Sequence, residues 1–241
     1  MDIITKDTGI TMGELIKEYK QKYPYINKVC FCGRLDPMAR GKVLLLLNEN
    51  CKKMPEHLNK DKVYEFEIML GVSTCSTDFL GEVGYTNKLN DYDYDNIKQQ
   101  ILDYIYKYNG VKFEQEYHCY SSKRHNGVPL WKMTKELGVY KQLFHTVKLH
   151  NVTFLEEKEY DYIKWRNDNI NIIKNVKGEF EQKMNIWRWN NFIKYDKKIK
   201  SLKFRIHTSS GFFVRQLVKD ISLNINFPLL TYDINRINII L

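Results

Sequence analysis

Residues 31–41 read Phe31-Cys32-Gly33-Arg34-Leu35-Asp36-Pro37-Met38-Ala39-Arg40-Gly41, with a single carboxylate in their middle. Glycine adopts backbone angles closed to other residues and proline fixes its own φ angle, so this stretch predicts a rigid loop that presents Asp36. The apolar run Val43 to Leu47 that follows has the length of a strand buried on both faces. We therefore expect the core to anchor this loop and Asp36 to face a cleft. An ordinary Asp-Pro turn beside a core strand is the alternative.

The composition is that of a folded, non-membrane protein. The 241 residues suffice for one large domain or two small ones, and 43% of them are hydrophobic and 14% aromatic. No apolar segment is long enough to cross a bilayer, and the first residues lack the features of a secretory signal. We expect a cytoplasmic monomer that contacts no membrane, with a nuclear or organellar location still open.

The charge balance favours a polyanionic partner. Lysine and arginine number 38 against 29 acidic residues, which gives a net charge of +9. AT-rich codon usage would also enrich lysine, and Ala39 is the only alanine. The five cysteines show no paired C-x-x-C spacing, which favours a reduced compartment without a disulfide framework or structural zinc.

Hydrophobic periodicity predicts the main strands and helices. Strands are expected at 64–70 with one buried face, at 146–155 with a bulge at His150-Asn151, and at 202–207. Helices are expected after the capping box Thr11-Glu14, over 97–108, from Pro129 to about Gly138, and from Phe213 onward, with Phe213, Leu217, Val218 and Ile221 inward and Arg215 in the first turns.

Two segments are harder to assign. Residues 113–127 are polar and aromatic, and we expect an exposed loop there. Residues 156–200 are rich in Asn and Lys and contain Trp165, Trp187 and Trp189. They predict either an inserted subdomain with its own helices or a long connection, with the tryptophans in its core in preference to an RNA-stacking surface.

Several stretches, in order along the chain, resemble the motifs of TruB-type pseudouridine synthases. Lys6-Asp7-Thr8-Gly9-Ile10-Thr11 is similar to K-P-x-G-x-[ST], the loop at Asp36 to G-x-L-D-P-x-A-x-G, and 210–215 to K-G-T-Y-I-R. Tyr64 with the Thr74, Asp78 and Gly81 pattern, and Gln115 with Tyr120-Ser121, resemble two further segments. The loop and its leucine run are also similar to RsuA-type synthases of ribosomal RNA, but S-G-x-F-V-R favours TruB.

The resemblance implies an α/β (α+β) pseudouridine synthase fold with a central mixed, largely antiparallel sheet flanked by helices. It implies one catalytic domain over 1–241, with a family-specific insertion at 156–200 and without the PUA domain that many relatives carry. The implied reaction isomerises the uridine of the TΨC loop in tRNA, with the tRNA T-arm as partner and with neither metal nor organic cofactor.

The resemblance also assigns site residues. Asp36 corresponds to the nucleophile, Arg215 to the arginine that pairs with it, and Tyr64 to the tyrosine that stacks on the base and assists proton transfer. The implied substrate-binding residues are Lys6, Phe31, Gly33, Phe213 and Ile234.

The chemistry is consistent with this set. Moving uracil from N1 to C5 attachment requires cleavage of the C1′–N1 bond, and a carboxylate can attack the sugar or support a glycal route. The base must leave its stack, so aromatic and apolar walls are needed. An arginine would keep the carboxylate ionised and aimed. Without the motifs, Tyr64 and Phe213 would be read as plain core and Arg215 as a surface ion pair.

Departures from the family pattern leave two alternatives open. Phe31 replaces a histidine, Asp7 a proline and Phe213 a tyrosine. The chain could be an RNA-binding or RNA-folding protein that has lost catalysis, or it could modify ribosomal or another RNA. RNA selection would then rest on the catalytic domain and the insertion, where Lys194, Lys197, Lys198 and Lys200 are candidate phosphate contacts.

Overall fold

The computed structural model describes residues 1–84, 92–138, 141–192, 195 and 197–241. Its strands are β1 Asp2–Lys6, β2 Val29–Cys32, β3 Arg40–Leu47, β4 Lys62–Leu70, β5 Lys112–Glu116, β6 Arg124–His125, β7 Val128–Pro129, β8 Phe144–Asp161, β9 Lys198–Thr208 and β10 Leu229–Ile239. Its helices are α1 Met12–Lys22, the short 3-10 helix η1 Asn48–Lys53, α2 Met54–Leu58, α3 Tyr94–Lys107, α4 Leu130–Leu137, α5 Tyr162–Asn175, α6 Gln182–Asn191 and α7 Val214–Asn224.

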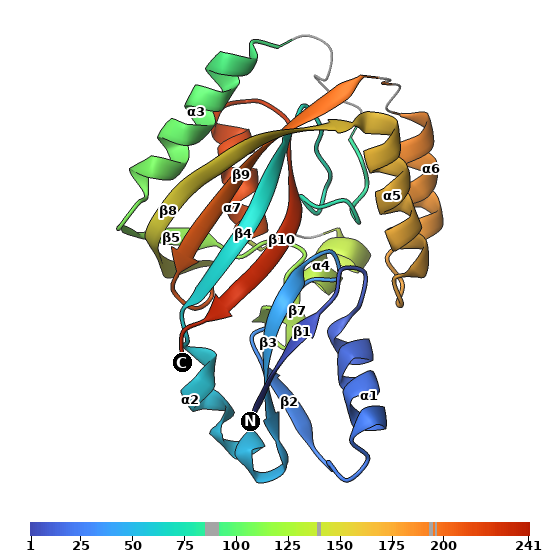
Figure 1. Ribbon diagram of the computed structural model, residues 1–241, viewed down its shortest axis with the longest axis vertical. Helices are drawn as coiled ribbons and strands as arrows, with labels where there is room; N and C mark the ends of the chain where they lie inside the picture. The colour runs from blue at the N-terminus through green and yellow to red at the C-terminus, as the bar shows by residue number, and fades with distance from the viewer. Residues whose placement is uncertain (85–91, 139–140, 193–194, 196) are drawn as a thin grey trace.

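Within these residues, an eight-stranded sheet has the order β1-β3-β10-β4-β9-β8-β5, with β2 also paired to β3 (Figure 1). The β3–β10 pair is parallel and the other pairs of this sheet are antiparallel. The predicted fold, a mixed and largely antiparallel sheet flanked by helices, is confirmed. The last strand, β10, lies between β3 and β4, so residues near the end of the chain adjoin the loop that carries Asp36.

Strand β4 is buried on both faces in its second half, where one buried face was predicted. Phe66, Ile68 and Leu70 belong to the hydrophobic cluster that contains the inward residues of α3 and α7. Met69 points the other way, into a second cluster with residues of α5 and α6. The prediction was wrong there because β4 is a central strand covered on both sides, and a strand covered on both sides loses its polar alternation.

The segment 156–200 is the paired ends of two long strands together with two helices. Strands β8 and β9 stay paired to Asp161 and Lys198, and α5 and α6 follow (Figure 1). Trp165 and Trp189 are buried, and the Trp189 ring stacks on Phe79 with centroids 3.8 Å apart. The interpretation of these two tryptophans as core is confirmed, whereas Trp187 is 52% exposed. The helices thus complete the second hydrophobic cluster of the sheet.

Residues 113–127 do not form the exposed loop that we expected. They include β5 and β6, and Gln115, His118 and Ser121 are buried. The prediction failed because the buried side chains of Gln115 and His118 find hydrogen-bond partners within the protein. Gln115, for example, exchanges two hydrogen bonds with the backbone of Phe213.

The predicted helices are present, and their ends follow local chemistry. Thr11 and Glu14 form the capping box of α1, and α4 begins directly after Pro129. In β8 the register shifts between Leu149 and Asn151, where a bulge was predicted. Phe213 precedes α7 and is half-buried, so it is not one of the inward helical residues.

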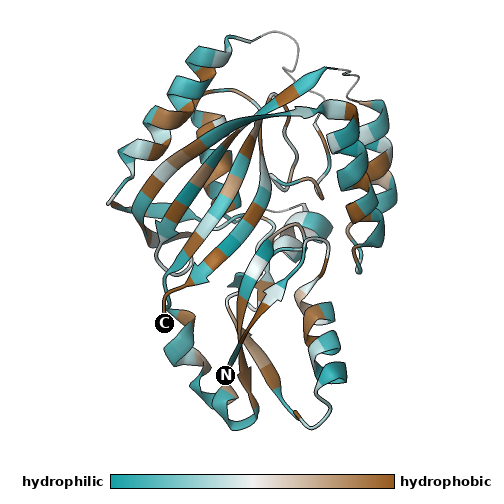
Figure 2. Cartoon of the chain, viewed as in Figure 1, coloured by the Kyte–Doolittle hydropathy of each residue, from teal (hydrophilic) through white to brown (hydrophobic). Residues whose placement is uncertain are grey.

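The two hydrophobic clusters lie on the two faces of the sheet, which explains why hydrophobic side chains are concentrated on its central strands. Figure 2 shows hydrophobic residues along the central strands, and the peripheral helices carry many hydrophilic ones. No helix in the described part of the chain has the length and apolar character required to span a membrane.

Candidate active site

The loop that carries Asp36 joins β2 to β3 and depends on glycine at both ends. Gly33 and Gly41 have φ angles of 90° and 113°, in the region that favours glycine. A Cβ at Gly41 would lie 2.4 Å from the carbonyl oxygen of Arg236, because β3 and β10 pair in parallel at this residue. The glycine therefore lets the last strand approach the loop.

Two buried cations bind the backbone of this loop. Lys6 Nζ donates to the carbonyls of Ala39 (2.5 Å) and Pro37 (3.2 Å), and Arg236 Nη2 donates to that of Gly33 (3.0 Å). Burial lowers the pKa of Lys6 to about 8, against the nearby carboxylates that raise it. Lys6 is fully buried. In this structure Lys6 supports the loop from beneath, and its role in substrate binding stays a prediction.

Arg215 pairs with Asp36, as the resemblance implied. Its Nε donates to Asp36 Oδ2 at 2.8 Å, and its Nη1 donates to the carbonyl of Ser76 at 2.9 Å. Nη1 also lies 3.5 Å from Asp78 Oδ2. The Arg215 side chain is 5% exposed and that of Asp36 is 34% exposed. The arginine is therefore fixed inside the protein, while the carboxylate that it orients remains open to a substrate.

Asp78 is the buried member of this group, and it was quoted in the sequence motif without being assigned a role. Its Oδ1 accepts hydrogen bonds from Ser76 Oγ (2.7 Å) and from the backbone N–H of Leu80 (3.1 Å). Burial raises the pKa of Asp78, and the Arg215 charge opposes that shift. One guanidinium thus lies between an accessible carboxylate and a buried one.

The start of α7 sets the position of Arg215. The Gln115 side chain accepts a hydrogen bond from the N–H of Phe213 (2.8 Å) and donates one to its carbonyl (3.1 Å). Gln115 is 1% exposed. Because Arg215 lies in the first turn, this amide fixes the backbone from which the arginine extends.

A neutral histidine, His118, adjoins the loop that contains Thr77 and Asp78. His118 Nδ1 accepts a hydrogen bond from the N–H of Tyr120, so Nε2 carries the proton and faces Thr77 Oγ1 at 3.3 Å. Burial, followed by the charge of Arg215, lowers the pKa of His118 well below its usual value. This histidine holds the loop before Asp78 without adding a second cation.

A pocket opens beside Asp36 and brings together five parts of the chain. It is lined by Thr8, Asp36, Met38, Ala39, Asp78, Phe79, Asn169, Ile172, Thr231, Tyr232, Asp233 and Ile234. The structure therefore places Ile234 on the same pocket as Asp36. Helix α5 contributes Asn169 and Ile172. Thr231 is 2% exposed, and its Oγ1 has no hydrogen-bond partner among the described residues.

The three predicted aromatic residues lie outside this lining. Tyr64 is 8% exposed in the main hydrophobic cluster, on β4 opposite Arg236. Phe31 packs at the edge of the same cluster, with the Arg34 guanidinium 5.5 Å from its ring centre. Phe213 contacts the rings of Tyr117 and His145. Their roles in substrate binding stay predictions.

Several residues of the pocket wall were not predicted from the sequence, for different reasons. Asp78 could have been found from its place in the motif loop, whereas Asn169, Ile172 and Thr231 carry no local signal. Of the lysines proposed for RNA, Lys194 lies outside the described residues. Lys198 Nζ and Lys200 Nζ lie 3.2 Å and 4.0 Å from Glu159, which neutralises part of their charge.

Comparisons with known proteins agree with the motifs. Residues 20–171 match the model of the TruB family pseudouridylate synthase, N terminal domain. The tRNA pseudouridine synthase B of Mesoplasma florum is 25% identical over 98% of this chain and 66% of its own length. The proteins of the same name from Mycoplasma capricolum and Nitratidesulfovibrio vulgaris are 35% and 33% identical, over 54% and 55% of this chain and 43% and 41% of theirs. The chain thus spans less than two thirds of the length of these relatives.

Solved structures show the same fold. A Cbf5-Nop10-Gar1 complex matches with a TM-score of 0.55 and 16% identity, over 98% of this chain and 48% of the matched chain. An H/ACA RNP bound to a substrate RNA containing 2′-deoxyuridine matches with a TM-score of 0.51 and 15% identity, over 98% and 47%. At this identity the likeness shows the fold alone. With the family model matching more than half of its residues, the chain belongs to the TruB family of pseudouridylate synthases.

Proposed function

We propose that this protein is an RNA pseudouridine synthase that acts on the TΨC loop of tRNA, at uridine 55. The observation that carries the proposal is the accessible Asp36 carboxylate, held by the buried Arg215 at the mouth of a pocket in a TruB-family fold. A pair of this kind fixes the carboxylate in one direction. Asp36 would attack C1′ of the sugar as a nucleophile, or remove the C2′ proton in a glycal route as the C1′–N1 bond breaks.

The pocket walls suit a flipped pyrimidine. Met38, Phe79, Ile172 and Ile234 supply apolar surface around Asp36. A base that leaves its stack requires such a surface and a few polar groups for its edge. Thr231 Oγ1, buried and without a partner in the described structure, can provide one hydrogen bond to the uracil edge. The cleaved base would thus be retained while it turns to present C5.

Tyr64 is proposed to stack on the base and assist proton transfer, as the family motif implies. It shares a hydrophobic cluster with Leu35 and Ile234, the residues next to Asp36 and on the pocket wall. Its backbone lies between Arg236 of β10 and Ile206 of β9 in the sheet.

The test compares the native protein with Asp36→Asn on a tRNA transcript and on an isolated T-arm hairpin. We expect the native protein to form pseudouridine at one position and Asp36→Asn to form none, with RNA affinity nearly unchanged because phosphate contacts dominate binding. Asp103→Asn, on the exposed face of α3, is the matched control and should keep full activity.

The outcomes separate the alternatives. Substantial turnover by Asp36→Asn would reject the assignment of the carboxylate. Binding without any modification by the native protein would favour an RNA-binding protein that has lost catalysis. Modification of ribosomal RNA but not of tRNA or hairpin would show that the substrate is ribosomal RNA while the reaction is the one proposed.

A further inference from the structure

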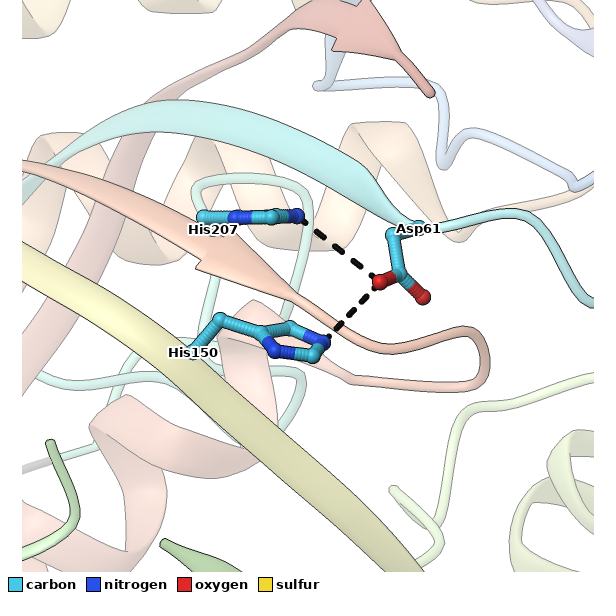
Figure 3. A group of neighbouring side chains, drawn as sticks. All are labelled: Asp61, His150 and His207. Atoms are coloured by element: carbon cyan, nitrogen blue, oxygen red, sulfur yellow. Dashed lines mark ion pairs between the residues drawn. The ribbon is translucent and has the colours of Figure 1, made fainter. Parts of the chain in front are cut away.

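A cluster of one carboxylate and two imidazoles lies away from the pocket beside Asp36. Asp61 directly precedes β4, His150 lies on β8 and His207 near the end of β9, and Figure 3 shows all three side chains converging. Asp61 Oδ2 is 3.0 Å from His150 Nε2 and 3.8 Å from His207 Nε2. None of the three lines the pocket beside Asp36.

The bulge in β8 brings this cluster together. His207 pairs with Val63 on one side and Asn151 on the other, and the register shift between Leu149 and Asn151 leaves His150 outside the ladder. A bulge re-aims the side chain of the extra residue. The two imidazole rings consequently stack, with centroids 4.5 Å apart and planes 26° from parallel.

The donor atoms have the spacing of a metal site. Zinc bonds of about 2.0–2.1 Å in a tetrahedron separate neighbouring ligand atoms by roughly 3.3 Å. The measured 3.0 Å and 3.8 Å bracket that value, and all three donor atoms lie within 4.8 Å of one another. Because the two rings lie within 26° of parallel, their in-plane lone pairs do not yet converge, and binding an ion would require each ring to turn about its Cβ–Cγ bond.

The nitrogens are also available for a metal. The Nε2 atoms of His150 and His207 are buried, and the group that both of them face is the Asp61 carboxylate, the third proposed ligand. The side chains themselves keep 27–36% of their surface, which leaves a route for an ion and room for a water ligand. Two imidazoles and one carboxylate suit Zn²⁺ and its neighbours in the transition series, whereas Mg²⁺ and Ca²⁺ prefer oxygen donors.

We propose that Asp61, His150 and His207 bind a zinc-class transition-metal ion that ties the start of β4 to β8 and the end of β9. No metal was expected from the sequence, because the cysteines lack C-x-x-C spacing, the family resemblance implied none, and these three ligands are far apart in the chain. The site is a structural clamp and takes no part in the isomerisation. Strand β4 leads to Tyr64 and β9 leads to the turn before Arg215, so the clamp holds two strands that feed the active site.

The test uses the full chain, stripped of metal by a chelator and titrated with ZnCl₂ in calorimetry and in thermal unfolding. We expect one ion per chain and, at zinc 100-fold above the dissociation constant, a rise in Tm of roughly 5–11 °C. His150→Ala and His207→Ala should lose this rise, with an affinity at least 10-fold to 100-fold weaker. His125→Ala, on β6, is the matched control and should behave like the native protein. MgCl₂ should produce no shift.

The exposed Cys75 is a competing ligand, so every titration is repeated in Cys75→Ser. Zinc binding that disappears in Cys75→Ser and survives in His207→Ala would overturn the proposal, as would the absence of stoichiometric binding. If the histidine variants fail to fold, Co²⁺ bound to the native protein decides. Intense visible bands of a tetrahedral ion without a thiolate charge-transfer band support the site, and weak octahedral bands or a thiolate band reject it.

Discussion

Replacing Arg215 by methionine would remove its contacts with two carboxylates, and the consequences for Asp36 and for Asp78 should differ. The guanidinium donates to Asp36 and lies 3.5 Å from Asp78, and Asp78 is only 5% exposed. Removing one partner of a buried ion pair costs about 3–5 kcal/mol, because a charge remains without compensation. Asp36 adds little to this cost, since its side chain is 34% exposed and water can replace the arginine. Arg215→Met should therefore lower the free energy of unfolding by about 3–5 kcal/mol through Asp78.

The pH dependence follows from the pKa of Asp78. Burial already raises it, and Arg215 opposes that shift, so the pKa should rise further in Arg215→Met. A carboxyl whose folded pKa lies above its unfolded value binds more protons when folded, so stability is lost as pH rises through that range. The variant should therefore be less impaired at pH 5 than at pH 8. Asn at position 78 keeps an acceptor oxygen and has no charge, so the double variant Arg215→Met, Asp78→Asn should recover stability.

Urea unfolding at the two pH values and pseudouridine formation on the tRNA transcript measure the two consequences. A hydrogen bond to a charged group contributes about 1.5–3 kcal/mol, so loss of the Asp36 contact should slow the reaction roughly 10-fold to 150-fold. The double variant should remain slow, because only Asp78 has been relieved. Equal destabilisation of the single and double variants, at both pH values, would refute the role given to Asp78.

Three further changes test other parts of the molecule. Asp220→Asn should raise the free energy of unfolding at pH 7.5 and leave it unchanged near pH 3.5, as measured by urea unfolding. Burial raises the pKa of Asp220 to about 6, so ionisation of this carboxyl at pH 7.5 costs up to about 3 kcal/mol. A loss of stability at pH 7.5 would contradict this. Trp189→Ala should cost about 3–5 kcal/mol, since the ring stacks on Phe79 at 3.8 Å in the core, and a change under 1 kcal/mol would mean that α6 is dispensable. Thr231→Val should lower kcat/KM roughly 2-fold to 12-fold while unfolding stability stays equal or rises, and unchanged kcat/KM would remove the threonine from substrate binding.

The local sequence pattern was sufficient to predict those helices and strands whose ends or buried faces depend on residues nearby in the sequence. The capping box at Thr11 began α1 and Pro129 preceded α4, as predicted. The one-face prediction for β4 failed because Met69 and its neighbours gain a second cover from α5 and α6, far along the chain. Strands β1, β2 and β10 were not predicted at all. Their pairing depends on the place of β10 between β3 and β4, which no short stretch of sequence records.

The candidate site divides in the same way. Asp36 and Arg215 could be named from sequence because each lies in a motif whose backbone geometry is local: a glycine-bounded loop and the first turn of a helix. Asp78 lies in such a motif as well, yet its role depends on its burial and on its ion pair with Arg215. Both follow from the three-dimensional fold and are not recorded in the local sequence. The pocket wall from α5 is different in kind. Asn169 and Ile172 line the same pocket as Asp36, and Trp165 and Trp189 pack α5 and α6 into the second hydrophobic cluster, so this packing decides which residues of α5 line the pocket. Trimming the 156–200 segment would therefore remove part of the pocket along with its lysines, and single lysine substitutions are the sounder way to test whether that segment binds RNA.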